Sequence, residues 1–163
     1  MAIVGYMGSG KTTLGRVLAR ALRREFVDLD RAIVKEAGKG IPEIFAEHGE
    51  ERFRELEHRA LLDALEDRTP SVVACGGGIV VRPENRALLR DVTTVFLRED
   101  TDVLYHRTRG PGRPLRAASR EEFETRYTER LPFYREVADL EVEVDGRPPA
   151  QVAEEVLGCL AKR

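Results

Sequence analysis

The chain has 163 residues, 42% of them hydrophobic and 34% charged, which suits one soluble globular domain with a single core. Its formal net charge of −2 gives no reason to expect nucleic acid or an anionic membrane as a partner. Cys75 and Cys159 lie far apart and the histidines are scattered, which disfavours a metal cage and a Ser-His-Asp triad. The chain has no long apolar run and no signal-like N-terminus, so we expect a cytoplasmic protein with reduced thiols.

Strand-like and helix-like segments alternate along the chain and are joined by short loops. This alternation predicts an α/β fold in which a five-stranded parallel sheet carries helices on both faces. Ligands of such sheets bind beyond the carboxyl ends of the strands. The helical segment at 41–65 is expected to break near Gly49, and the last strand, which alternates apolar and acidic residues, indicates a sheet edge. Strands are expected at 2–4, 25–30, 71–75, 93–97 and 140–144.

A phosphate-binding loop is predicted at the first strand–helix junction, where residues 5–13 read GYMGSGKTT and fit G-x-x-x-x-G-K-[ST]. Converging backbone N–H groups and the N-terminus of the next helix suit the charge of a nucleoside triphosphate. Lys11 is expected to reach the β- and γ-phosphates, and the Thr12 hydroxyl to take a position on Mg²⁺. A chance match in a glycine-rich turn is the alternative, which the flanking strand and helix disfavour. The binding residues expected here are Gly8, Ser9, Gly10, Lys11, Thr12 and Thr13.

Two carboxylates, Asp28 and Asp30, close the second expected strand. Residues i and i+2 of a strand point to the same side, so the pair is expected to face one site. One carboxylate would hold Mg²⁺ through water, and the other would accept a hydrogen bond from a substrate hydroxyl and help to deprotonate it. The alternative is that one of them caps a helix beginning at Arg31.

Two further candidates precede and follow the third strand. Arg54 and Glu57 are three residues apart on a helix, where the alternative to a functional role is a solvated ion pair of little value. Three consecutive glycines at 76–78 follow the strand, and they indicate that a ligand approaches the backbone closely there, against the alternative of a plain turn.

The segment at 108–116, TRGPGRPLR, is rich in arginine and has no apolar period. It is predicted to be a lid that closes over the nucleotide and places an arginine on the phosphates, the alternative being an ordinary surface loop. Ser119 to Glu122 fits a capping box that opens the next helix. Arg130 follows in this helix, which Pro132 is expected to end, and its guanidinium can grip a carboxylate with two parallel hydrogen bonds.

Taken together, these segments resemble the shikimate kinases, in the nucleoside-monophosphate-kinase group of P-loop folds. The resemblance covers nearly the whole chain, in order, through GYMGSGKTT, FVDLD, ERFRELE, CGGG, GRPL and RLPFYREVA. It implies a single three-layer P-loop kinase domain over residues 1–163. Within it, the resemblance implies a mobile lid at about 109–121 and a substrate-binding helical segment at about 31–62.

The resemblance also implies roles for the candidates on the substrate. Asp30 would hold the shikimate hydroxyls, while Asp28 would act on the Mg²⁺ side through water. Arg54 and Arg130 would clamp the shikimate carboxylate, and Glu57 would brace Arg54. The triple glycine would hold the substrate by backbone contact, through Gly76, Gly77 and Gly78.

On the nucleotide, the resemblance places Arg113 on the phosphates, Arg107 against adenine and Arg147 in a loop that borders adenine. The implied reaction transfers the γ-phosphoryl group of ATP to the 3-hydroxyl of shikimate with Mg²⁺. Its products would be 3-phosphoshikimate and ADP, a step toward aromatic amino acids. The catalytic groups would be Lys11, Asp30 and Arg113, in a protein expected to be a monomer without nucleic-acid or membrane partners.

Other functions remain as alternatives at this point. A gluconate kinase also carries a phosphate loop and acts on a hydroxy acid, but Asp30, Arg54, Gly77 and Arg130 together argue against it. A regulatory nucleotide-binding module without catalysis predicts the loss of Lys11, Asp30 or the lid arginine, and the sequence retains all three. A nucleic-acid-dependent ATPase is disfavoured by the net charge and the small size.

Overall fold

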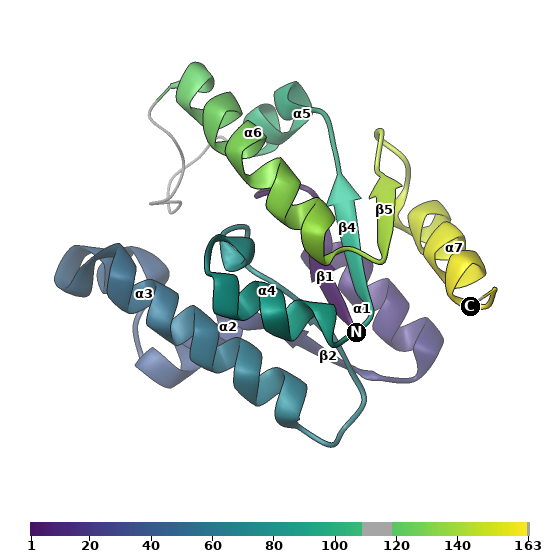
Figure 1. The fold of residues 1–163 in the computed structure, drawn as a ribbon, viewed down its shortest axis with the longest axis horizontal. Helices are drawn as coiled ribbons and strands as arrows, with labels where there is room; N and C mark the ends of the chain where they lie inside the picture. The colour runs from purple at the N-terminus through teal and green to yellow at the C-terminus, as the bar shows by residue number, and fades with distance from the viewer. Residues whose placement is uncertain (109–118, 163) are drawn as a thin grey trace.

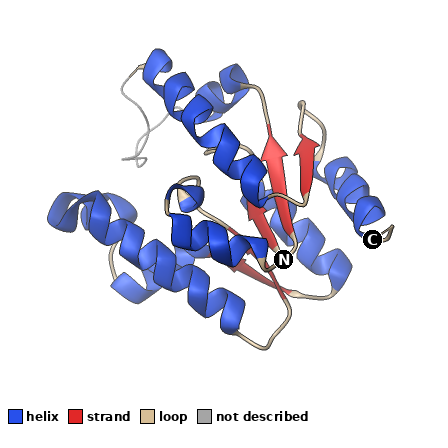
Figure 2. Cartoon of the chain, viewed as in Figure 1, coloured by secondary structure: helices blue, strands red, loops and turns tan. Residues whose placement is uncertain are grey.

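Five parallel strands form one sheet in the order β2-β3-β1-β4-β5, with helices on both faces (Figures 1 and 2). The structure, a computed structural model, describes residues 1–108 and 119–162. The predicted α/β architecture with a five-stranded parallel sheet is therefore confirmed. The strands are β1 (Ala2–Val4), β2 (Glu25–Asp28), β3 (Ser71–Ala74), β4 (Thr94–Arg98) and β5 (Leu140–Glu143).

The short strand β1 occupies the centre of the sheet, and all three of its residues are fully buried. It pairs with β3 and β4, so Ala2 lies opposite Val73 on one side and Thr94 on the other. A strand covered on both faces is apolar throughout, which explains its sequence. The phosphate-binding loop therefore leaves from the middle of the sheet.

Two apolar clusters cover the two faces of the sheet. Ala2 and Val4 face the cluster to which α2, α3, α4 and α6 contribute, and Ile3 faces the cluster of α1 and α7. Successive residues of a strand point to opposite faces, so β1 serves both clusters. The helices are α1 (Lys11–Leu22), α2 (Leu29–Ala37), α3 (Ile41–Glu66), α4 (Pro83–Arg90), α5 (Thr101–Arg107), α6 (Arg120–Val137) and α7 (Pro149–Leu160), with a short 3₁₀ helix η1 at Ile79–Val81.

Several local predictions are confirmed. Helix α3 is interrupted at Gly49, whose φ of 77° and ψ of 178° are not helical. Strand β5 is an edge strand in which buried and exposed residues alternate. Ser119 caps α6, because its side chain accepts a hydrogen bond of 3.1 Å from the backbone N–H of Glu122.

Among residues 1–108 and 119–162, none of the helices combines the length and the apolar character of a membrane span.

The predicted end of a helix at Pro132 is wrong, because α6 continues through this residue to Val137. A proline removes one backbone donor and crowds the preceding turn, a cost that tertiary packing can offset. Tyr134 and Val137 follow the proline, and both are buried in the core. Their burial keeps the last turns of α6 on the sheet, which holds Arg130 and Tyr134 on one continuous helix.

Candidate active site

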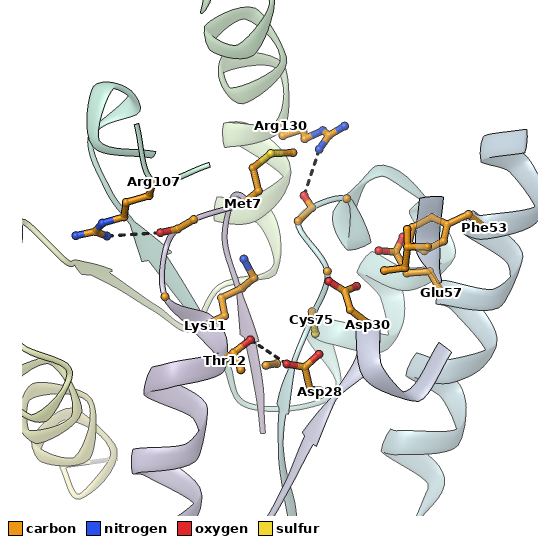
Figure 3. A pocket seen from close by; sticks show the side chains of 17 residues that line it. Met7, Lys11, Thr12, Asp28, Asp30, Phe53, Glu57, Cys75, Arg107 and Arg130 are labelled. Atoms are coloured by element: carbon orange, nitrogen blue, oxygen red, sulfur yellow. Dashed lines mark hydrogen bonds between the residues drawn. The ribbon is translucent and has the colours of Figure 1, made fainter. Parts of the chain in front are cut away.

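A cavity of about 520 Å³ opens beyond the carboxyl ends of β1, β2 and β3 (Figure 3). This is the end of the sheet at which the sequence predicts a ligand. The cavity brings together segments from across the whole chain. Its lining consists of Met7, Gly8, Gly10, Lys11, Thr12, Asp28, Asp30, Ile41, Phe53, Glu57, Ala74, Cys75, Gly76, Gly77, Gly78, Arg107 and Arg130.

The phosphate-binding loop curls through three glycines with positive φ, 150° at Gly5, 85° at Gly8 and 91° at Gly10. These angles favour glycine, so the motif spacing follows from the backbone path. Lys11 is buried and folds back over the loop, where its Nζ donates 2.8 Å to the carbonyl of Tyr6 and 3.4 Å to Ser9 Oγ. A loop of this shape, held by a lysine at the start of a helix, provides converging donors for an anion.

Thr12 and Asp28 meet on the floor of the cavity, where Thr12 Oγ1 donates 2.9 Å to Asp28 Oδ2 (Figure 3). The other oxygen of Asp28 accepts 3.3 Å from the backbone N–H of Arg31 and caps α2, which begins at Leu29. The capping alternative is therefore confirmed for Asp28, while its role toward Mg²⁺ stays a prediction for the oxygen that Thr12 contacts.

The same pair fits Mg²⁺, which takes hard oxygen ligands and usually keeps several waters beside one or two protein groups and substrate phosphates. Thr12 supplies a hydroxyl and Asp28 a carboxylate at the phosphate end of the cavity. No group of three or more His, Cys, Asp and Glu side chains in the described part of the chain is arranged to hold a metal. An ion here would thus depend on nucleotide phosphates for much of its coordination.

Asp30 lines the same cavity, although the structural reason predicted for it is wrong. Strand β2 ends at Asp28, and Asp30 is the second residue of α2 rather than a strand residue. The cap at Asp28 starts the helix, so the two carboxylates reach one site across a strand–helix junction instead of along a strand. Figure 3 shows Asp30 on the side of the cavity nearest Cys75 and Glu57.

Arg54 and Glu57 form a buried ion pair on α3, with 2.7 Å between Arg54 Nη1 and Glu57 Oε2. Glu50 accepts a second bond of 3.0 Å from Arg54 Nη2. Arg54 is 6% exposed and Glu57 is 1% exposed, so the alternative of a solvated ion pair is wrong. Burial raises the pKa of Glu57, Arg54 opposes this shift, and the nearby charge of Asp30 adds to it. Glu57 Oε1 has no hydrogen-bond partner among residues 1–108 and 119–162.

The three glycines after β3 make room for neighbouring groups of the protein itself. A Cβ at Gly76 would lie 2.5 Å from Glu57 Oε1, and a Cβ at Gly78 would overlap the Arg54 guanidinium. A Cβ at Gly77 would lie 3.1 Å from the backbone nitrogen of Met7. The groups that approach this backbone closely in the structure are side chains of α3 and the backbone of the phosphate-binding loop, and the approach of a ligand stays a prediction.

Arg130 reaches the glycine turn from α6, on the side opposite α3. Its Nη1 donates 3.3 Å to the carbonyl of Gly77 (Figure 3). The Tyr134 hydroxyl donates 2.5 Å to the same oxygen. The Arg130 guanidinium also lies 5.5 Å from the ring centroid of Tyr6. Two arginines, Arg54 and Arg130, therefore flank one turn of backbone from two different helices.

Arg107 lies at the other end of the cavity, at the end of α5. Its Nη1 donates 3.0 Å to Glu99 Oε2 and lies 3.5 Å from the carbonyl of Gly8. Glu99 is only 4% exposed, so a buried carboxylate holds the Arg107 guanidinium in place. We call Gly8–Thr13 with Arg107 the nucleotide side. Arg54, Glu57, Gly76–Gly78 and Arg130 form the acid side.

Some predicted residues are not gathered in the cavity. Arg147 is not in the lining: its Nη1 pairs with Glu155 at 2.6 Å and its other nitrogens bond the carbonyls of Glu143 and Val144. Ser9 and Arg54 are buried beside the cavity without lining it, and Thr13 is exposed on α1. Residues 109–118, with Arg109, Arg113 and Arg116, lie outside the described residues, while residues 119–121 form the cap and first turn of α6.

Sequence reasoning did not assign Tyr6, Tyr134 or Glu99 to the site. Tyr134 lies four residues after Arg130 on α6, a spacing that places the two side chains on one helical face. Glu99 follows the end of β4, and its burial has no signal in the sequence pattern. Cys75 also lines the cavity, but burial raises the pKa of its thiol to about 12, which disfavours the reactive thiolate.

Comparisons with known proteins agree with this geometry. A family model described as shikimate kinase matches residues 7–161. A shikimate kinase of Marinomonas sp. (strain MWYL1) is 41% identical over 98% of this chain and 91% of its own length. The solved shikimate kinase from Acinetobacter baumannii in complex with shikimate has a TM-score of 0.93 at 34% identity, covering 99% of this chain and 92% of that one.

The likeness to a gluconokinase is weaker and extends to the fold alone. The structure of the enzyme from Sinorhizobium meliloti 1021 has a TM-score of 0.57 at 20% identity, over 99% of this chain and 90% of that one. The family model and the near full-length relative settle the assignment. The chain belongs to the shikimate kinase family.

Proposed function

We propose that the protein is a shikimate kinase that transfers the γ-phosphoryl group of ATP to the 3-hydroxyl of shikimate. The products would be 3-phosphoshikimate and ADP, on the route to aromatic amino acids. One observation carries the proposal: Arg130 and the Gly76–Gly78 turn line one cavity with the phosphate-binding loop, and Arg54 lies directly behind Gly78 of that turn. A phosphate site and a two-arginine site for a carboxylate thereby face each other around Asp30.

The acid side is suited to a small carboxylate. An arginine guanidinium is a planar fork of donors that matches the two oxygens of a carboxylate; Arg130 would present such a fork, and Arg54 would add the N–H groups that Glu50 and Glu57 leave over. Glu57 and Glu50 fix the orientation of Arg54 before any ligand arrives, which lowers the cost of ordering it on binding. The backbone of Gly76–Gly78 lies between the arginines and would contact the ring of the substrate.

Asp30 is proposed to orient the 3-hydroxyl and accept its proton as the oxygen attacks phosphorus. It lines the same cavity as the phosphate-binding loop and the glycine turn. Phosphoryl transfer needs little covalent help from a protein, so position and electrostatics are its main contributions. A carboxylate aimed at the attacking oxygen supplies both.

On the nucleotide side, the N–H groups of Gly8–Thr13 are proposed to hold the phosphates, and Lys11 to exchange the carbonyl of Tyr6 for phosphate oxygens. Thr12 would bind Mg²⁺ directly and Asp28 through water, at their observed junction. When bound, the ion neutralises charge on the β- and γ-phosphate oxygens. Arg107 would lie against adenine, held by Glu99.

Two further arginines are proposed to bind the nucleotide, and no contact described for the cavity supports their roles. Arg113, in the proposed lid at about 109–121, would neutralise charge on the transferring phosphoryl group. Arg147 would border adenine from outside the cavity, after exchanging its half-exposed pair with Glu155.

We further propose one kinase domain over residues 1–163, with a substrate-binding segment at about 31–62, acting as a cytoplasmic monomer without nucleic-acid or membrane partners. Support for a monomer comes from the surface of the described residues, where the only exposed large hydrophobic side chains are Val34 and Val81. Isolated apolar side chains of this kind do not form an interface.

The test is ADP release by the purified protein with ATP and Mg²⁺, with and without shikimate, beside gluconate and nucleoside monophosphates. Strong stimulation by shikimate alone is expected. Stimulation by gluconate instead would favour the related hydroxy-acid kinase. No stimulation by any acceptor would overturn the proposed reaction and leave a nucleotide-binding protein whose two arginines need a different acid.

A further inference from the structure

Helix α4 begins just after the glycine turn and packs against η1, α3 and α6. Its third and fourth residues, Asn85 and Arg86, point back at η1, the short 3₁₀ helix that continues the glycine turn. Neither residue lines the cavity, and the reaction proposed above gives neither of them a role. Their contacts connect the structural elements that carry the acid side.

Asn85 is fully buried and uses both ends of its amide. Its Nδ2 donates 2.9 Å to the carbonyl of Ile79, and its Oδ1 lies 2.7 Å from Nδ1 of His58. Because the carbonyl of Ile79 can only accept, the amide orientation is fixed, and His58 must donate from Nδ1. His58 is the neighbour of Glu57 on α3, so Asn85 joins η1 to the helix that carries Arg54.

Arg86 makes the corresponding connection to α6. Its Nη1 donates 2.9 Å to the carbonyl of Val80 and 3.2 Å to that of Val81. Its Nε lies 2.9 Å from Glu136 Oε2, an ion pair outside hydrogen-bond alignment, and its guanidinium lies 4.5 Å from the centre of the Phe133 ring. Glu136 and Phe133 belong to α6, the helix that carries Arg130.

We infer that Asn85 and Arg86 are positioning residues, which hold the Gly76–Gly78 turn between α3 and α6 and thereby set the gap between Arg54 and Arg130. This inference rests on the proposed function, since the gap matters only if both arginines grip one carboxylate. The physical basis of the inference is that the two side chains donate hydrogen bonds to three consecutive carbonyls of η1.

Besides the contacts of Asn85 and Arg86, the carbonyl of Gly77 accepts hydrogen bonds from Arg130 and Tyr134 of α6, and the turn makes few backbone bonds of its own. Within the turn and η1, the backbone bonds run from Ile79 N to Gly76 O at 3.2 Å and from Val81 N to Gly78 O at 3.0 Å. Glycines have wide conformational freedom, so a turn of three needs external contacts to hold one shape. Buried carbonyls also need partners, and Asn85 and Arg86 supply them to Ile79 and Val80, whereas the bond from Arg86 to the carbonyl of Val81 is exposed.

The consequence for binding follows from the packing of Gly78 under Arg54. The Cβ that Gly78 lacks would overlap the Arg54 guanidinium, so the two groups are in contact. A displacement of the turn therefore displaces Arg54 relative to Arg130. A misplacement of about 1 Å in a positioned group can cost about 100-fold in rate.

The binding test compares Asn85→Leu and Arg86→Met with Arg90→Met by calorimetry of shikimate and ADP. Arg90→Met is the matched control, because Arg90 lies on the same helix, pairs with the same Glu136 at 3.0 Å, and contacts no η1 carbonyl. The dissociation constant for shikimate is expected to rise about tenfold in the first two variants, and that for ADP to stay unchanged. An intermediate value is expected for Arg86→Lys, which keeps a donor for the carbonyls.

Two results of this test would overturn the inference. One is an unchanged shikimate affinity in folded Asn85→Leu and Arg86→Met. The other is an equal loss of shikimate and ADP affinity, since that pattern indicates a general loss of structure rather than a displaced acid side. A merely structural role lowers the melting temperature and leaves the ratio of the two affinities unchanged.

A second measurement does not depend on shikimate. Amide hydrogen exchange at Ile79 and Val81, measured in the free protein, reports the two backbone bonds of the turn. Exchange about tenfold or more faster in Asn85→Leu and Arg86→Met than in Arg90→Met is expected, and unchanged protection would overturn the inference. If the unaltered protein fails to bind shikimate, the proposed function falls, and the exchange rates still decide whether Asn85 and Arg86 hold the turn.

Discussion

The nucleotide side and the acid side of the cavity are built in opposite ways. The nucleotide side comes mainly from one contiguous stretch, Gly8–Thr13, in which backbone N–H groups and one folded-back lysine provide the donors. The acid side comes from α3, the glycine turn and α6, and its donors are side chains of Arg54 and Arg130. One side depends on local backbone geometry, and the other on how three distant segments pack.

This difference predicts different sensitivities. Packing changes on α3, α4 or α6 are expected to alter recognition of the acid while nucleotide binding persists. Tyr6 is the main contact between the two sides, because its carbonyl accepts from Lys11 and its ring lies under Arg130. Variants of single residues on each side can therefore test how separate the sides are.

The largest effect is expected at Asp30, which belongs to neither side. Asp30→Asn keeps the shape of the side chain and removes the base, so kcat should fall by about 100- to 10,000-fold. Steady-state kinetics and calorimetry of ADP measure the two consequences. Affinity for ADP should change little, and a kcat within a few-fold of the unaltered protein would contradict the role of Asp30.

The next effect is expected at the glycine turn. Gly78→Ala places a methyl group on the Arg54 guanidinium, the mobile end of a side chain, so Arg54 should move while the fold survives. The shikimate dissociation constant should rise about 10- to 100-fold, as for the loss of charged hydrogen bonds. Gly158→Ala is the control: its Cβ meets nothing within 4 Å on α7, and it should add about 0.5–1 kcal/mol of stability without changing affinity.

A smaller effect is expected on the nucleotide side from Glu99→Gln. The amide still accepts from Arg107 but loses the charge, and charge-assisted hydrogen bonds are about twice as strong as neutral ones. The KM for ATP should rise about three- to tenfold, with the KM for shikimate unchanged. Glu155→Gln, which neutralises the partner of Arg147 outside the cavity, should have a smaller effect on either constant, and an equal effect would contradict the distinction between the two arginines.

The smallest effect concerns the pH dependence of stability through Glu57. Burial raises the pKa of this carboxyl in the folded state, so its contribution is fully present below the unfolded pKa and is lost as pH rises through the folded pKa. Urea unfolding should therefore show that the free energy of unfolding of the unaltered protein falls relative to that of Glu57→Gln as pH rises above about 4.3. A shift in the opposite direction would mean that the pair with Arg54 outweighs burial.

The two sides also differed in how far the sequence could predict them. The phosphate-binding loop was predicted residue by residue, because the spacing of its glycines reflects a local backbone path. Arg54 and Glu57 gave no decisive pattern of their own, since an i, i+3 pair looks the same on a buried and on a solvated helix face. Their roles came from the family resemblance, and their burial from the structure.

Other errors arose where tertiary contacts overrode local rules. Pro132 was expected to end a helix that burial of Tyr134 and Val137 continues. Asp30 was placed on a strand, but the cap formed by Asp28 starts α2 two residues earlier. Glu99 had no sequence signal because its burial depends on how α5 packs beside the phosphate-binding loop.

The most direct test of the acid side uses shikimate and its methyl ester, which lacks the carboxylate charge, as substrates for the unaltered protein and Arg130→Ala. The ratio of kcat/KM for the acid to that for the ester should be at least about 100 in the unaltered protein. In Arg130→Ala this ratio should fall about tenfold or more, because the substitution lowers kcat/KM for the acid and leaves kcat/KM for the ester unchanged. The same ratio in both proteins would contradict the claim that paired arginines on α3 and α6 recognise the substrate carboxylate.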